Sequence, residues 1–145
     1  MGQQQLLLIV LSVIIVGIAV AVGITTFQSN AVEANRQAVI SDLVNYASKA
    51  QRFFRTPTQL GGGSQNFQNF GLSPIDTANA NGSYAVVTSV PTGATPVTGA
   101  VTQVTASALT IYIQGSGKET GNDGTNPVKA YTTVVADTIS PTILN

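Results

Sequence analysis

The feature that most constrains this chain is an apolar run over residues 6–24. Fourteen of these nineteen residues are Leu, Ile or Val, and the first 32 residues of the chain contain no Asp, Glu, Lys or Arg. A helix rises about 1.5 Å per residue, so a helix over residues 4–27 is about 36 Å long and exceeds the roughly 30 Å hydrocarbon core of a bilayer. The run therefore predicts a helix that is able to span a membrane.

A secretory signal peptide and a plain single-span anchor are two other interpretations of such a run. At about −0.3 to −0.6 kcal/mol each, the fourteen aliphatic residues favour membrane insertion by about 4 to 8 kcal/mol. A signal peptide also has a basic region, a shorter apolar core and a cleavage site with small residues. Here the run follows Gly2 and three glutamines, and the first basic residue is Arg36. This mismatch disfavours the signal peptide.

The residue inventory excludes most catalytic chemistry. The 145 residues include no Cys and no His, and they carry six acidic and six basic side chains. Without Cys and His there is no disulfide framework, no thiolate or imidazole metal site, no haem attachment motif and no Ser-His or Cys-His pair. The balanced charge lacks the basic field that nucleic-acid binding needs. We expect a non-enzymatic protein without a cofactor and without a nucleic-acid partner.

Beyond the apolar run, the pattern predicts that the same helix continues as an amphipathic half. Apolar side chains recur at intervals of three, four and seven residues, and polar side chains lie between them. Pro57 disfavours helical geometry at the preceding residue, so the helix ends near Arg55. We expect one helix over residues 3–55, about 80 Å long. The apolar stripe of its second half is expected to form a seam with the rest of the chain through Val39, Leu43, Tyr46, Ala50 and Phe53.

The remainder of the chain predicts a loop and then a sheet. Residues 57–82 are rich in Gly, Asn and Gln, and we expect Phe67 and Phe70 to pin this loop to the core. Segments rich in Val, Thr, Ile and Tyr follow, and their short connections predict an antiparallel meander. The expected strands are residues 83–90, 97–105, 108–114 and 128–137, with residues 115–127 as an exposed loop and Ile139, Ile143 and Leu144 in a tail that folds back on the domain.

Two local patterns in this part are weak. Asn81, Gly82 and Ser83 match the acceptor pattern for glycosylation, which is usually incidental in a bacterial chain. Glu119 and Asp123 lie in the expected loop, but their spacing matches no calcium-binding loop and two carboxylates are few. We expect no metal site.

The expected fold is α+β. A meander with one apolar face needs a cover, and the amphipathic helix half is the available partner. A long N-terminal helix therefore packs its second half on a four-stranded antiparallel β-meander, while its apolar half protrudes. We divide the chain into residues 1–27 as a membrane or filament-core segment, 28–56 as the amphipathic half, 57–82 as the αβ-loop and 83–145 as the sheet domain.

This architecture, together with the sequence MGQQQLLLIVLSVIIVGIAVAVGITTF and the later ANRQAVISDLVNYASKAQRFFRTP, resembles the type IV pilin family, which includes the pseudopilins of type II secretion. The resemblance implies a major pilin, a structural subunit that spans the inner membrane and then self-assembles into an extracellular filament at the cell surface. Helices then form the filament core and sheets form its outer wall. A prepilin peptidase, a membrane assembly platform and ATPases are the implied partners.

The resemblance also implies roles for individual residues. The peptidase cuts family members, and we expect Met1 to be the first mature residue and the site of N-methylation, after a removed leader. The fifth mature residue is usually a glutamate that pairs with the N-terminal amine of a neighbour, whereas here it is Gln5, an acceptor without a full charge. We expect the subunit assembly surface to comprise Gln5, Leu6, Ile9, Val13, Ile14, Gly17, Ala21 and Gly23.

Two other functions stay open at this point. One is a pseudopilin of a type II secretion system. The other is a single-span anchored module that binds carbohydrate or acts as an adhesin through its sheet.

Overall fold

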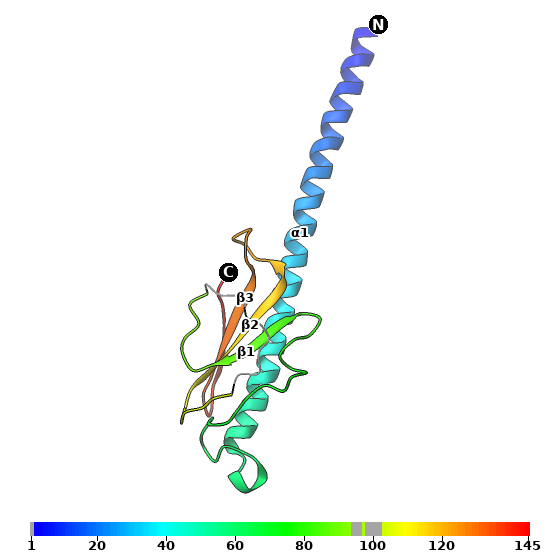
Figure 1. The fold of residues 1–145 in the computed structure, drawn as a ribbon. Helices are drawn as coiled ribbons and strands as arrows, with labels where there is room; N and C mark the ends of the chain where they lie inside the picture. Colours follow the sequence, from blue (N-terminus) through cyan, green and yellow to red (C-terminus); the bar gives the residue numbers. More distant parts are fainter. Residues whose placement is uncertain (1, 94–96, 98–102) are drawn as a thin grey trace.

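The computed structural model describes residues 2–93, 97 and 103–145 (Figure 1). Within these residues, one long helix, α1 (Gly2–Arg55), packs on a four-stranded antiparallel sheet in the order β1-β2-β3-β4. The strands are β1 (Gly82–Val87), β2 (Ile111–Thr120), β3 (Pro127–Val134) and β4 (Ile139–Ile143), and a short 3-10 helix, η1 (Thr58–Leu60), follows α1. The predicted α+β fold, with a long helix on an antiparallel meander, is confirmed.

Helix α1 has nearly the limits that the sequence predicts. It ends one residue before Thr56, whose backbone N–H still donates to the carbonyl of Arg52 at 3.0 Å. Pro57 follows in an extended conformation and cannot continue the ladder. The N-terminal half of the helix leaves the domain and extends alone, whereas the second half lies along the sheet (Figure 1).

The register of the sheet brings small residues to its centre. Tyr84, Gly115, Ala130 and Ile143 are successive cross-strand neighbours from β1 to β4. A Cβ at Gly115 would lie 2.9 Å from Val39 Cγ1 of α1, closer than side chains normally approach. Glycine at this position therefore allows the helix to lie close to β2.

Several predicted strand limits are wrong, and β1 ends at Val87 instead of residue 90. The expected loop at 115–127 is mostly strand, because residues 115–120 belong to β2, and its turn is confined to residues 121–126. Its Gly, Ser and Lys residues have low strand propensity, but Ser116 pairs with both Ser83 of β1 and Lys129 of β3, and this pairing outweighs local preference. The segment 108–110 lies outside β2, and β3 ends at Val134 instead of residue 137.

The expected strand at 97–105 lies largely outside the described residues. Of its described part, Gln103 forms an isolated bridge with Gly71, and Val104 exchanges backbone hydrogen bonds with the loop at Asn69 and Phe70. The C-terminal tail folds back on the domain as expected. It forms the fourth strand of the sheet, β4, which pairs with β3 at the edge.

The core lies between α1, the inner face of the sheet and the loop after α1. Val39, Leu43 and Ala50 of the helix are fully buried. The loop closes the lower end of this core with aromatic rings, as predicted. Phe67 packs on Phe54 with ring centroids 4.8 Å apart, and Phe70 packs on Phe53 at 5.4 Å.

We predict that Leu43→Ala destabilises the domain by about 2–5 kcal/mol, because a buried leucine is replaced by a cavity. The measurement is denaturant unfolding of the soluble fragment 28–145, which we expect to fold as a monomer. Val44→Ala is the matched control, since Val44 is the exposed neighbour and its loss should stay within about 0.5 kcal/mol. Equal losses for the two variants would place Leu43 outside the seam.

Candidate assembly surface

The first half of α1 presents aliphatic side chains on every side. All fourteen Leu, Ile and Val side chains of residues 6–24 are between 47 and 68 % exposed. No other described part of the chain covers them. Transfer of one such side chain from water to an apolar environment contributes about 1.5–3 kcal/mol, so this surface needs a lipid or protein partner.

The hydroxyl groups of Ser12, Thr25 and Thr26 are satisfied within the helix itself. The hydroxyl of Ser12 donates to the carbonyl of Ile9 at 2.7 Å, and those of Thr25 and Thr26 both donate to the carbonyl of Val22 at 2.9 Å. An unpaired hydroxyl in an apolar medium costs several kcal/mol. These bonds make the segment compatible with an environment that lacks water.

The structure places the expected assembly residues as follows. Met1 lies outside the described residues, and Gln5 and the others are exposed along α1. At 3.6 residues per turn, Leu6, Ile9, Val13, Gly17 and Ala21 share one face of the helix, with Ile14 at its margin and Gln5 and Gly23 to one side. A Cβ at Gly17 or Gly23 would meet nothing within 4 Å in this chain. Any contact that needs a small residue there must come from another molecule.

The expected helix-sheet seam consists of buried residues with one exception. Val39, Leu43, Tyr46 and Ala50 are buried, whereas Phe53 is partly buried at the edge of the core. Sequence reasoning missed Ala47 and Phe54, which are also buried. Both lie beside the predicted stripe. The buried face of a helix that packs on a sheet is wider than a single line of residues.

A polar cluster around Asp42 joins the helix to the loop before β1, and no sequence pattern indicates it. Asp42 Oδ2 accepts hydrogen bonds from Tyr84 Oη at 2.7 Å and from Asn79 Nδ2 and Asn81 Nδ2 at 2.8 Å. Asn79 Oδ1 in turn accepts from the backbone N–H groups of Asn81 and Gly82, which fixes the turn into β1. One carboxylate of α1 therefore positions the start of the sheet.

The cluster shifts the ionisation of its members. Burial raises the pKa of Asp42, but the hydrogen bonds from Asn81, Tyr84 and Asn79 together outweigh it, so the pKa lies below its usual value. Burial and the adjacent Asp42 carboxylate raise the pKa of Tyr84. Asp42 is therefore charged and Tyr84 neutral near pH 7, which matches one acceptor to one donor.

Two further ties hold the same end of the sheet to α1. Asn35 Oδ1 accepts from the backbone N–H groups of Lys118 and Glu119 in β2. Arg36, which pairs with Glu33, donates to the backbone carbonyl of Asn145 at 3.1 Å. Asn145 also bonds to the backbone of β3 through its side chain. The β2–β3 hairpin and the tail are thus fixed to the helix just beyond its apolar half.

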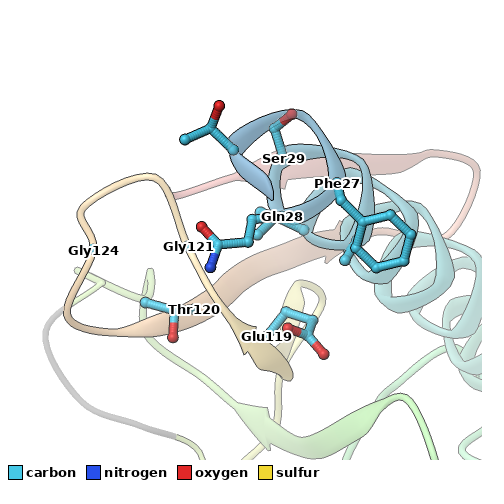
Figure 2. A pocket seen from close by; sticks show the side chains of 10 residues that line it. Phe27, Gln28, Ser29, Glu119, Thr120, Gly121 and Gly124 are labelled. Atoms are coloured by element: carbon cyan, nitrogen blue, oxygen red, sulfur yellow. The ribbon is translucent and has the colours of Figure 1, made fainter. Parts of the chain in front are cut away.

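A groove lies beside the apolar half, between α1 and the β2–β3 turn (Figure 2). Its volume is about 710 Å³. The helix wall is formed by Thr25, Phe27, Gln28, Ser29, Ala31 and Val32, and the hairpin wall by Glu119, Thr120, Gly121 and Gly124. Phe27 is 77 % exposed, so an aromatic ring stands free at this edge of the domain.

The weak local patterns of the sequence have structural roles. The side-chain amide of Asn81 donates to Asp42, so it is engaged in the fold instead of projecting freely as a glycosylation acceptor. The carboxylate of Asp123 accepts from the backbone N–H groups of Thr125 and Asn126 and from the Asn126 side chain. The hydrogen bonds to Asn126 and Thr125 lower the pKa of Asp123 to about 2. Among the described residues, no three potential metal ligands lie together.

In the part of the chain that the structure describes, α1 is the one helix long and apolar enough to cross a membrane. The chain matches no protein-family model, no curated protein and no solved structure.

We predict that Asp42→Asn destabilises the fragment 28–145 by about 1–3 kcal/mol at pH 7, because it removes a charged acceptor from three donors. The loss should shrink at low pH. A carboxyl with a lowered pKa in the folded state contributes stability above its unfolded-state pKa, near 3.9, and loses it as the pH falls through the folded-state value.

The measurement is the free energy of unfolding of wild type and variant between pH 7 and pH 2. Asp137→Asn is the control, since Asp137 is exposed and forms only a 3.5 Å contact with Arg55. A constant difference between wild type and Asp42→Asn across this range would contradict the role given to the carboxylate.

Proposed function

We propose that this chain is a structural subunit that inserts its apolar half into the inner membrane and then self-assembles through it into an extracellular filament of the type IV pilus kind. The single observation that carries the proposal is the fully exposed aliphatic surface of residues 6–24 on a helix that is continuous with the core of a folded domain. Its activity is assembly, with no catalytic step.

Two apolar environments suit this surface, namely lipid tails before assembly and other copies of the segment after it. Lipid tails satisfy it before assembly, because every side of the segment is apolar and its hydroxyls bond within the helix. The same segment of other copies satisfies it afterwards. The face that carries Gly17 and Ala21 supports close packing, since small residues four apart let helix backbones approach where packing drives association.

Gln5 fits an assembly that relies on packing. A glutamate in an apolar helix bundle needs a cationic partner, because an unpaired buried charge is costly. An amide carries no such charge and can still accept a hydrogen bond from an N-terminal amine. Among residues 1–32 no acidic or basic side chain is present to set the register of neighbouring helices.

The direct test is negative-stain microscopy of material sheared from the surface of cells that express the chain with its assembly machinery. We expect long, uniform fibres in which this chain is the main component. Recovery of the chain only as single copies in the membrane fraction would support the anchored binding module instead.

We predict that Ile14→Asp abolishes both insertion and fibre formation. A carboxylate at mid-span costs about 2.5–3.5 kcal/mol on insertion scales, and it finds no cationic partner in a bundle of these helices. Fractionation and fibre yield are the measurements. Ile75→Asp is the control, because Ile75 is 84 % exposed on the loop of the domain and its change should leave the fibre yield unaltered.

We also predict different outcomes at the two glycines of the segment. Gly17→Leu should block fibre formation while leaving membrane insertion intact, because its bulk meets nothing within the chain and acts only against a neighbour. Gly23→Ala adds one methyl group and about 1 kcal/mol of helix preference, so fibres should form with an altered rise or stiffness if the helix loosens there on assembly. Wild-type fibres from both variants would remove the glycines from the assembly surface.

A further inference from the structure

We propose that the Leu60 turn (residues 57–63) of one copy docks into the hairpin groove (residues 25–32 and 119–124) of a second copy, with Leu60 against Phe27 and Arg52 facing Glu119. The inference rests on the proposed filament function and names the contact between successive domains. The two surfaces lie at opposite ends of the same domain (Figure 1).

The Leu60 turn is a rigid apolar projection. Leu60 is 77 % exposed on η1, although Leu60 N–H donates to the Pro57 carbonyl at 3.0 Å and Gly63 N–H donates to the Phe53 carbonyl at 2.8 Å. Gly62 and Gly63 pack so tightly on the backbone of Thr56 and Asn66 that a Cβ at either position would clash. A surface that is already ordered loses little conformational entropy on binding.

The hairpin groove offers apolar contacts beside the polar side chains of Thr25, Gln28 and Ser29. Its helix wall contains Phe27, Ala31 and Val32, and glycines form part of the facing hairpin wall, which leaves room for an entering side chain. Figure 2 shows the Gln28 side chain of the helix reaching into this space beside Gly121 of the hairpin. A volume of about 710 Å³ accommodates the Leu60 side chain together with part of the turn that carries it.

The charges at the two ends of the domain favour contact between opposite ends of two copies. In the described part of the chain, Glu119 and Arg52 form no ion pair, and Arg55 pairs with the exposed Asp137 at 3.5 Å and donates to the Ala136 carbonyl at 3.1 Å. Glu119 lies in the groove and the two arginines lie in the last turn of α1, at the other end of the domain. Head-to-tail stacking brings opposite charges together, whereas two copies that meet by the same end bring like charges together.

The dimensions of the chain also suit this contact. Residues 2–27 of α1 span about 39 Å and residues 28–55 about 42 Å at 1.5 Å per residue. A second copy displaced by about 44 Å along a parallel axis places its residue 28 level with residue 57 of the first. Because this contact joins two different surfaces, it repeats from copy to copy and builds an open fibre.

The test uses disulfide formation in fibres of the full chain, which has no cysteine of its own. A chain with both Leu60→Cys and Thr120→Cys should give, after mild oxidation, a ladder of dimers, trimers and longer species on non-reducing gels. The matched control pairs Ile75→Cys with Thr120→Cys, because Ile75 is also exposed but belongs to neither the Leu60 turn nor the hairpin groove, and it should give no ladder.

Fibres of normal yield without a ladder from the Leu60 pair would overturn the docking contact and leave the proposed function standing. Absence of fibres from the wild-type chain would overturn both.

A charge exchange gives a second, independent readout if the cysteine variant does not assemble. Glu119→Arg and Arg52→Glu should each lower fibre yield by about tenfold, since each opposes two like charges, and the combined variant should recover most of the wild-type yield. Single losses without recovery in the combined variant, or no loss in either single variant, would overturn the assignment of this pair.

Discussion

The rest of this structure depends on the cost of leaving an aliphatic helix surface in water. Fourteen Leu, Ile and Val side chains protrude from the domain, and the described part of the chain has nothing to cover them. At about 1.5–3 kcal/mol for each side chain that leaves water, the sum is larger than the total stability of a typical domain. A lipid or protein partner that covers this segment would remove that cost.

The sheet is attached to α1 at several fixed positions. If the protruding helix carries the association, then the sheet must stay attached to the same helix at fixed positions. Val39 against Gly115 sets the close approach, while Asn35, Arg36 and Asp42 fix polar groups of the loop, the hairpin and the tail to α1. Lys49 and Asp76 add an ion pair between α1 and the loop, whereas Arg52 and Glu119, near the two ends of the domain, form no ion pair within the described part of the chain.

These features together describe a molecule with distinct lateral and axial surfaces. The apolar half of α1 supplies an all-round surface for lipid or for parallel helices, and the two ends of the domain carry a rigid exposed leucine turn and a groove of opposite charge. Lateral packing of a segment without charged side chains leaves the axial offset between neighbouring helices weakly determined. An end-to-end contact between domains would determine that offset.

Much of the fold follows from the sequence alone, because its signals are local. The long apolar run, the three- and four-residue spacing after it and Pro57 determine α1 nearly to the residue, and the aromatic residues of the loop indicate where it is pinned. The extension of β2 through residues 115–120, the use of the tail as β4, the Asp42 cluster and the groove were decided only in three dimensions. Each of these depends on partners in another element, such as Lys129 for Ser116 and Tyr84 for Asp42, or on the gap left between two packed elements. The pattern of a single segment carries no information about such partners, since pairing across a sheet and burial of a carboxylate become favourable only once the helix and the strands have come together.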